Sequence, residues 1–297
     1  MGTPEFAVAS LKALVNSNHD IVGVITAPDR PQGRGKKIGV SAVKVYALSK
    51  KLKVLQPENL KDELFIKELL VLKADLQIVV AFRMLPEIIW AMPKRGTFNL
   101  HASLLPDYRG AAPINWALVN GETETGVTTF FLDNKIDTGK IILQKKEVIY
   151  ENDDFGTLHN RLMLKGAVLI LETIALIEMR SVKALPQIDA NSFHLAPKIF
   201  KQNCEIKWNQ EADQIINFVR GMSPYPAAWC EFNNEMLKIF QANKTNANHL
   251  DPGEFESDGT SYLHIGTQTS NLTVNSLQIQ GKKRMTIEEF LRGYRMK

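Results

Sequence analysis

Short, nearly continuous apolar runs alternate with amphipathic segments along the first half of the chain. The apolar runs lie at residues 21–26, 76–82, 97–101 and 126–132. The segments at residues 7–16, 41–52 and 60–72 have the spacing of helices with one buried face. Apolar strands separated by helices are typical of a parallel sheet that is covered on both sides. The pattern predicts an open, doubly wound, mainly parallel α/β sheet, with ligands at the carboxyl ends of its strands.

The pattern changes in the second half of the chain. A long helical pattern covers residues 157–178, and the irregular stretch that follows contains Pro186 and Pro197. Beyond it, strand-like runs at residues 236–242, 261–265 and 271–279 are separated by glycines, as in a small β-barrel or sandwich. We therefore predict that the chain consists of a first domain over residues 1–182, a linker over residues 183–200 and a second domain over residues 201–297.

Composition narrows the class of protein. An apolar fraction of 44% and a charged fraction of 23% are typical of a soluble globular chain. No apolar run is long enough for a membrane span, and nothing resembles a secretory signal. The two cysteines, Cys204 and Cys230, predict unpaired thiols in a reducing compartment. No metal-binding spacing is present in the sequence.

Charge is concentrated in one segment. Residues 29–53 contain eight basic residues and one acidic residue, although the net charge of the whole chain is only +4. A local basic cluster suggests a polyanionic partner such as a nucleic acid. A solvated basic face explains the charge equally well, so charge alone leaves both interpretations open.

Three polar residues can supply the chemistry of acyl transfer. Asn99 and His101 lie two positions apart at the end of a predicted strand, so their side chains share one face. Asp137 lies in the loop after the next strand, from which it can reach the same cleft. Donors on Asn99 and His101 can stabilise a developing oxyanion, and His101, oriented by Asp137, can transfer a proton. A single histidine in a strand is also often structural, so the residues alone do not decide.

The segment from Ser103 to Ile114 resembles the signature of folate-dependent formyltransferases, and residues 121–128 and 137–139 extend the match. The resemblance implies a Rossmann-like domain in which Asn99, His101 and Asp137 are the catalytic residues. It also implies 10-formyltetrahydrofolate as co-substrate, with no metal. The folate contacts that it implies are Phe82, Met84, Leu85, Asp133, Ser103, Leu104, Leu105 and Pro106.

Four further segments are similar to the members of this family that act on methionyl-tRNA. They lie at residues 2–7, 28–37, 220–229 and 281–285. This similarity implies that the second domain is an OB-like barrel that helps to hold tRNA. It also implies a cytoplasmic monomer whose partner is methionyl initiator tRNA. Arg34 is expected to matter most for the acceptor stem, within a tRNA-binding group that comprises Arg30, Arg34, Lys36 and Lys37.

One feature departs from the family, whose members begin with a strand before the turn that corresponds to residues 2–6. Only Met1 precedes that turn here. We therefore expect the first strand to be missing, either because the start is misplaced or because the chain is truncated. A missing strand leaves neighbouring edges unpaired. A longer chain that carries the strand should therefore have a higher thermal midpoint, and equal midpoints would contradict this.

Three alternative functions remain. A formyltransferase that acts on a nucleotide-linked amino sugar would share the signature segment but would not need the basic cluster. A folate-dependent hydrolase would use water in place of the amine. A non-catalytic RNA-binding protein would explain the charge but not the set of Asn99, His101 and Asp137.

Overall fold

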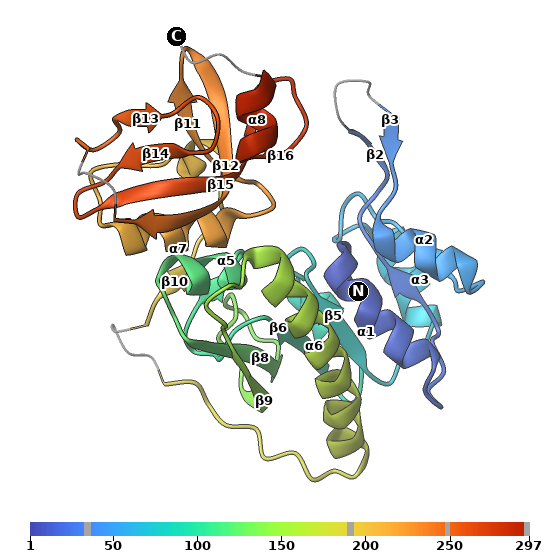
Figure 1. Cartoon of the computed structure of the whole chain (residues 1–297). Helices are drawn as coiled ribbons and strands as arrows, with labels where there is room; N and C mark the ends of the chain where they lie inside the picture. The colour runs from blue at the N-terminus through green and yellow to red at the C-terminus, as the bar shows by residue number, and fades with distance from the viewer. Residues whose placement is uncertain (33–36, 189–192, 247–249, 294–297) are drawn as a thin grey trace. The chain divides into compact units, whose positions relative to one another are not determined.

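The computed structural model describes residues 1–32, 37–188, 193–246 and 250–293. The chain forms two compact units (Figure 1). The first unit comprises Met1–Gly110, Gly126–Glu147 and His159–Leu195. The second comprises Ala111–Thr125, Val148–Leu158 and Ala196–Lys297, so it takes two segments from the predicted first domain. None of the described helices is long and apolar enough to cross a membrane.

Helices of the first unit form where the amphipathic pattern predicts them. They are α1 (Glu5–Val15), α2 (Ala42–Ser49), α3 (Glu63–Val71) and most of the long α6 (Phe155–Glu178). The sequence pattern did not predict the short α4 (Glu87–Trp90). Two helix starts are capped by side chains. Ser41 accepts a hydrogen bond from the backbone N–H of Lys44, and Asp62 accepts one from that of Phe65.

The central sheet of the first unit has the order β5 (Gln77–Val80), β6 (Thr97–His101), β8 (Glu124–Phe131) and β9 (Ile141–Val148). Strands β5 and β6 are parallel. Strand β8 is antiparallel to β6, with Phe98 opposite Phe131 and His101 opposite Thr128. The predicted α/β class is therefore confirmed, with one strand reversed. Two further pairs are β1 (Val24–Ile25) with β4 (Val54–Leu55) and the hairpin of β2 (Arg30–Gln32) with β3 (Lys37–Gly39).

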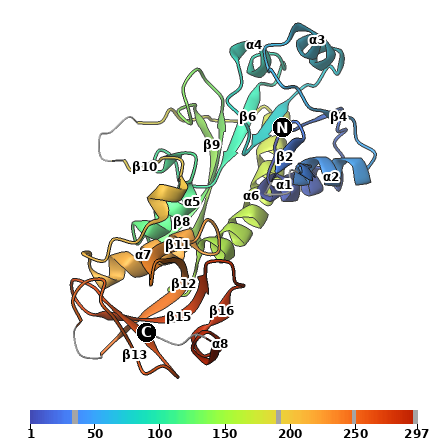
Figure 2. The same ribbon diagram turned by 90° about the horizontal axis from the view of Figure 1, so that it is seen from above.

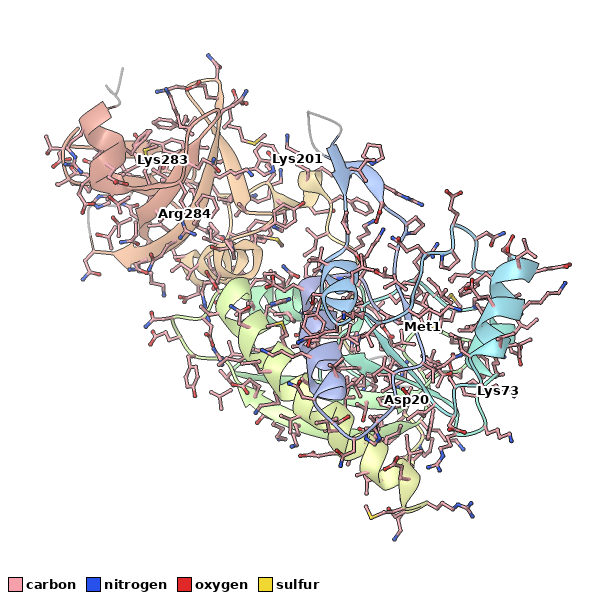
Figure 3. The ribbon with its side chains drawn as sticks, turned by 90° about the vertical axis from the view of Figure 1, so that its right-hand side faces the viewer. Met1, Asp20, Lys73, Lys201, Lys283 and Arg284 are labelled. Atoms are coloured by element: carbon pink, nitrogen blue, oxygen red, sulfur yellow. The ribbon has the colours of Figure 1, made fainter. Side chains whose placement is uncertain are left out.

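Met1 and Gly2 lie between β1 and β5. The N–H of Gly2 donates to the carbonyl of Ile25 over 3.0 Å, and the carbonyl of Met1 accepts from the N–H of Val80 over 2.9 Å. Within the described residues, β1 and β5 do not pair with each other. A cavity of about 140 Å³ lies here, lined in part by Met1 and Asp20 (Figure 3). Met1, Gly2 and this cavity therefore lie at the position where the resemblance predicts a first strand.

The second unit is built around a curled antiparallel sheet (Figure 2). The strand order is β11 (Ala228–Phe232), β12 (Glu235–Thr245), β15 (Asn271–Ile279), β14 (Leu263–Gly266) and β13 (Phe255–Ser257), and β16 (Met285–Thr286) pairs with β15. The half-barrel is consistent with the predicted OB-like fold. Its core includes Ile215 and Val219 of α7 (Ala212–Met222). The other elements of this unit are α5 (Pro113–Val119), α8 (Ile287–Gly293) and the 3-10 helix η1 (Lys201–Cys204). Two short strands complete the chain, β7 (Arg109–Gly110) in the first unit and β10 (Leu195–Ala196).

Candidate active site

Strand β6 presents two polar side chains on one face and two apolar ones on the other. Phe98 and Leu100 are buried in the core, which fixes the strand. Asn99 and His101 alternate with them and therefore point to the opposite face. Asn99 is half-buried, and its side chain makes no hydrogen bond with the described residues. Its amide is therefore available to a substrate.

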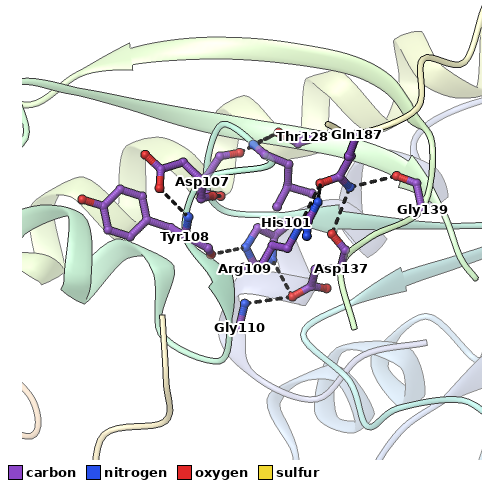
Figure 4. Close-up of polar contacts among 11 residues, drawn as sticks. His101, Asp107, Tyr108, Arg109, Gly110, Thr128, Asp137, Gly139 and Gln187 are labelled. Carbon is purple, nitrogen blue, oxygen red and sulfur yellow. Dashed lines mark hydrogen bonds and ion pairs between the residues drawn. The ribbon is translucent and has the colours of Figure 1, made fainter. Parts of the chain in front are cut away.

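Each ring nitrogen of His101 faces an oxygen atom (Figure 4). Its Nε2 lies 2.8 Å from the carbonyl oxygen of Tyr108. Because a carbonyl oxygen only accepts, Nε2 must carry the hydrogen of that bond. Nδ1 faces the Oδ2 atom of Asp137 at 3.7 Å. With 6% of its surface exposed, the imidazole is fixed in orientation before any substrate binds.

Asp137 reaches His101 by a different route from the one that the sequence suggests. We expected it to lie at the carboxyl end of a parallel strand, but β8 is antiparallel to β6. The loop that follows β8 starts beside the opposite end of β6, where the N–H of Leu132 donates to the carbonyl of Thr97. The loop must therefore run back along β6 to bring the carboxylate to His101. The N–H of Gly110 donates to Asp137 Oδ2 over 3.0 Å and fixes the carboxylate.

The segment after β6 is braced from within the first unit. Ser103 Oγ donates to the carbonyl of Asp107 over 2.6 Å, and Thr128 Oγ1 donates to the carbonyl of Ser103 over 2.6 Å. The N–H of Leu105 in turn donates to Thr128 Oγ1. Ser103 and Leu105 are buried, and Leu104 and Pro106 are half-buried. These contacts hold the loop that carries Tyr108, Arg109 and Gly110 against His101 and Asp137.

Comparison with known proteins identifies the family. Residues 1–174 match the model of the formyl transferase family, and residues 198–295 match that of the formyl transferase C-terminal domain. The chain belongs to the formyl transferase family.

Curated relatives from this family match the chain over nearly its whole length. The chain is similar to a methionyl-tRNA formyltransferase of Parabacteroides distasonis, with 56% identity over 99% of this chain and 94% of the relative. A methionyl-tRNA formyltransferase of Bacteroides fragilis is 52% identical, over 100% and 94% of the two chains. Among solved structures, an N-formyltransferase of Helicobacter canadensis in complex with folinic acid and dTDP-3-aminofucose gives a TM-score of 0.66 at 23% identity, over 92% and 96%. At that identity, the last likeness shows the fold alone.

The residues predicted to contact folate have varied environments. Leu85 is buried in a core with Ile25 and Leu55, and Phe82 is partly buried against the same core. Met84 is 64% exposed. Asp133 organises its own loop, because it accepts hydrogen bonds from Thr138 Oγ1 and from the N–H of Lys135. The folate contacts, including those of Ser103 to Pro106, stay predictions.

The basic segment is only partly described. Arg30 is exposed at the start of the β2–β3 hairpin. Arg34 and Lys36 lie outside the described residues, as does the side chain of Lys37. Arg83 donates to the carbonyls of Pro57 and Glu58. Burial, together with repulsion from Arg30, lowers the pKa of the Arg83 guanidinium below its ordinary value.

Arg109 and Gln187, which the sequence analysis did not select as site residues, form hydrogen bonds around Asp137. Arg109 donates through Nε and Nη2 to Oε1 of Gln187, over 3.0 and 2.8 Å. Gln187 Nε2 donates to the carbonyls of Asp137 and Gly139, over 2.9 and 2.8 Å. Arg109 lies inside the signature segment and was visible there, but Gln187 lies in the predicted linker and no pattern marks it.

Both cysteines are free and buried. Burial raises the pKa of the Cys230 thiol to about 12 and raises that of Cys204 as well. Neither thiol is therefore a nucleophile at neutral pH.

Proposed function

We propose that this protein transfers the formyl group of 10-formyltetrahydrofolate to the amino group of methionyl initiator tRNA, a reaction that takes place in the cytoplasm. Two observations together carry the proposal. The chain holds Asn99, His101 and Asp137 around one strand end, and it is 56% identical to a methionyl-tRNA formyltransferase along nearly its whole length. As in the sequence-based expectation, we infer that it acts as a monomer.

The proposed chemistry needs no nucleophile from the protein, because the methionyl amine itself attacks the formyl carbon. Negative charge then develops on the formyl oxygen, and the free amide of Asn99 donates a hydrogen bond to that oxygen. The amine loses a proton during the attack. His101 is the nearby group that can relay this proton. Its Nε2 donates to the carbonyl of Tyr108, and its Nδ1 faces the carboxylate of Asp137. The carrier nitrogen takes up a proton as it leaves, so the proton count balances.

Exposed apolar side chains in two loops support the folate part of the proposal. The apolar Met84 is 64% exposed after β5, and Ile136 is 63% exposed in the loop after β8. Exposed apolar side chains in loops suit the flat rings of a folate, since binding would remove them from water. We assign the predicted folate residues to this role, with no metal.

The basic segment favours tRNA over a small acceptor. Eight basic residues lie between residues 29 and 53, and Arg30 among them is exposed. A nucleotide sugar carries too few phosphates to require such a cluster, whereas an acceptor stem presents a row of phosphates. We assign Arg30, Arg34, Lys36 and Lys37 to the contact with tRNA.

The decisive experiment measures formyl transfer from 10-formyltetrahydrofolate at two salt concentrations. The acceptors are methionyl initiator tRNA, an amino-sugar nucleotide, and none. Transfer to tRNA that weakens with salt would support both the chemistry and the basic contact. Transfer to the sugar alone, or deformylation of folate without an acceptor, would keep the catalytic residues and overturn the substrate.

A further inference from the structure

Asp137 has a left-handed backbone conformation, which other contacts must stabilise. Its φ is +55°, in the left-handed region that side chains other than glycine adopt at a cost. It lies in a loop whose neighbours Asn134, Lys135 and Ile136 are exposed. An exposed loop does not by itself hold one residue in such a conformation, so other contacts must fix it.

Besides the hydrogen bonds that Asp133 accepts within the loop, two contacts on the turn come from one amide. Gln187 Nε2 donates to the carbonyls of Asp137 and Gly139, which are the two ends of the turn. The segment that carries Gln187 is itself anchored, because Leu185 and Ile141 exchange backbone hydrogen bonds of 2.8 and 2.9 Å. Gln187 therefore ties the turn to an ordered backbone.

Arg109 sets the orientation of that amide. Its guanidinium donates twice to Gln187 Oε1, so the oxygen faces Arg109 and the NH₂ group must face the two carbonyls. The neighbours of Arg109 contact the catalytic side chains directly. The carbonyl of Tyr108 accepts from His101, and the N–H of Gly110 donates to the carboxylate of Asp137.

We infer that Arg109 and Gln187 form a positioning pair, which locks the 137–139 turn so that the carboxylate of Asp137 faces His101. This inference rests on the proposed function, because it assigns the pair to the same site. Neither residue is expected to touch a substrate. Both act through Asp137, with Arg109 one step further away.

The kinetic test is a double-mutant cycle on the full chain. We expect Gln187→Ala to lower kcat about 10- to 100-fold, since a misplacement near 1 Å has effects of this order. KM for both substrates should change little, because no substrate contact is lost. In an Asp137→Asn background, Gln187→Ala should cause almost no further loss. Arg109→Ala should likewise add little to Gln187→Ala.

Ile188→Ala is the matched control, because Ile188 is 76% exposed in the same segment. Its kcat and thermal midpoint should equal those of the parent. Two outcomes would overturn the inference. One is an equal loss of kcat from Gln187→Ala in the parent and in the Asp137→Asn background, and the other is a rise in KM alone.

A spectroscopic readout keeps this test separate from the proposed function. The imidazole ¹⁵N resonances of His101 report the contact with Asp137 whether or not the protein formylates tRNA. Gln187→Ala should move them in the direction seen for Asp137→Asn, and Ile188→Ala should leave them in place. If the resonances of Gln187→Ala match the parent, the positioning role is wrong even if tRNA is the acceptor. If they move while tRNA is not formylated, only the proposed substrate is wrong.

Discussion

The end of β6 and the β2–β3 hairpin both carry predicted functional residues, but the protein holds them in different ways. His101 is buried, and hydrogen-bond acceptors face both of its ring nitrogens. Arg30, at the start of the hairpin, is exposed to solvent. Groups that act on a bond in the transition state must be placed to a fraction of an ångström, whereas charges that attract phosphates act over several ångströms. The contrast predicts large, position-specific effects at β6 and smaller, salt-dependent effects at the hairpin.

The largest effect should follow from removing the free amide at β6. We expect Asn99→Ala to lower kcat about 100- to 1000-fold, as is usual when an oxyanion donor is lost. Because the side chain of Asn99 makes no hydrogen bond with a described residue, the thermal midpoint should stay close to that of the parent. Steady-state kinetics and thermal melts measure both quantities. Asn160→Ala, at an exposed position of α6, is the control. Activity of Asn99→Ala within a few-fold of the parent would remove Asn99 from the mechanism.

The next largest effect on kcat is expected from a substitution that displaces the turn after β8. A Cβ atom added at Gly139 would lie 1.7 Å from the carbonyl oxygen of Phe131, so the turn would have to move. We expect Gly139→Ala to lower kcat by about 100-fold through misplacement of Asp137. Gly293→Ala is the control, because no atom of the described residues lies within 4 Å of the added atom. Parent-like kcat for Gly139→Ala would show that the site does not depend on this turn.

The same contrast explains what the sequence could predict. The α/β class and the shared face of Asn99 and His101 follow from strand periodicity, which is a local property. The direction of β8 does not, because a strand buried on both faces is apolar whichever way it runs. The position of Asp137 in the loop after β8 led to its selection, although the expected route from that loop to the site was wrong.

Gln187 shows a second limit of prediction from the sequence. Its partner Arg109 is 78 positions away along the chain, so only the folded backbone brings the two together. A single amide between a proline and an isoleucine carries no periodic or compositional signal. Residues that act through others are hard to find from the sequence for this reason, since their role depends on geometry that no local pattern encodes.

A smaller effect is expected at the basic segment. Arg34→Ala should raise KM for methionyl initiator tRNA and leave KM for folate unchanged. The slope of log(kcat/KM) against log salt should fall by about one unit, as expected for the loss of one phosphate contact. Lys12→Ala, at an exposed position of α1, should leave the slope unchanged. Equal changes for both substrates, or none, would contradict a specific contact between Arg34 and tRNA.

The smallest effect concerns the base of the hairpin, where the basic segment has an internal anchor of its own. Asp29 Oδ2 lies 2.5 Å from Lys44 Nζ, and Gln56 Nε2 donates to Asp29 Oδ1 over 2.9 Å. The hydrogen bonds from Lys44 and Gln56 lower the pKa of Asp29 below its ordinary value of 3.8. A lowered carboxyl pKa stabilises the fold above the unfolded value, and this stability is lost as pH falls through the folded value. Asp29→Asn should therefore lower the thermal midpoint slightly at neutral pH.

The pH dependence separates this anchor from a general loss of packing. The difference in thermal midpoint between Asp29→Asn and the parent should be constant above about pH 5 and should shrink toward zero as the pH falls below 4. Lys44→Met should show the same trend, because it removes the other half of the ion pair. A difference that persists at low pH would mean that shape, and not charge, holds the base of the hairpin. The hairpin would then resemble the end of β6 more closely than its exposed arginine suggests.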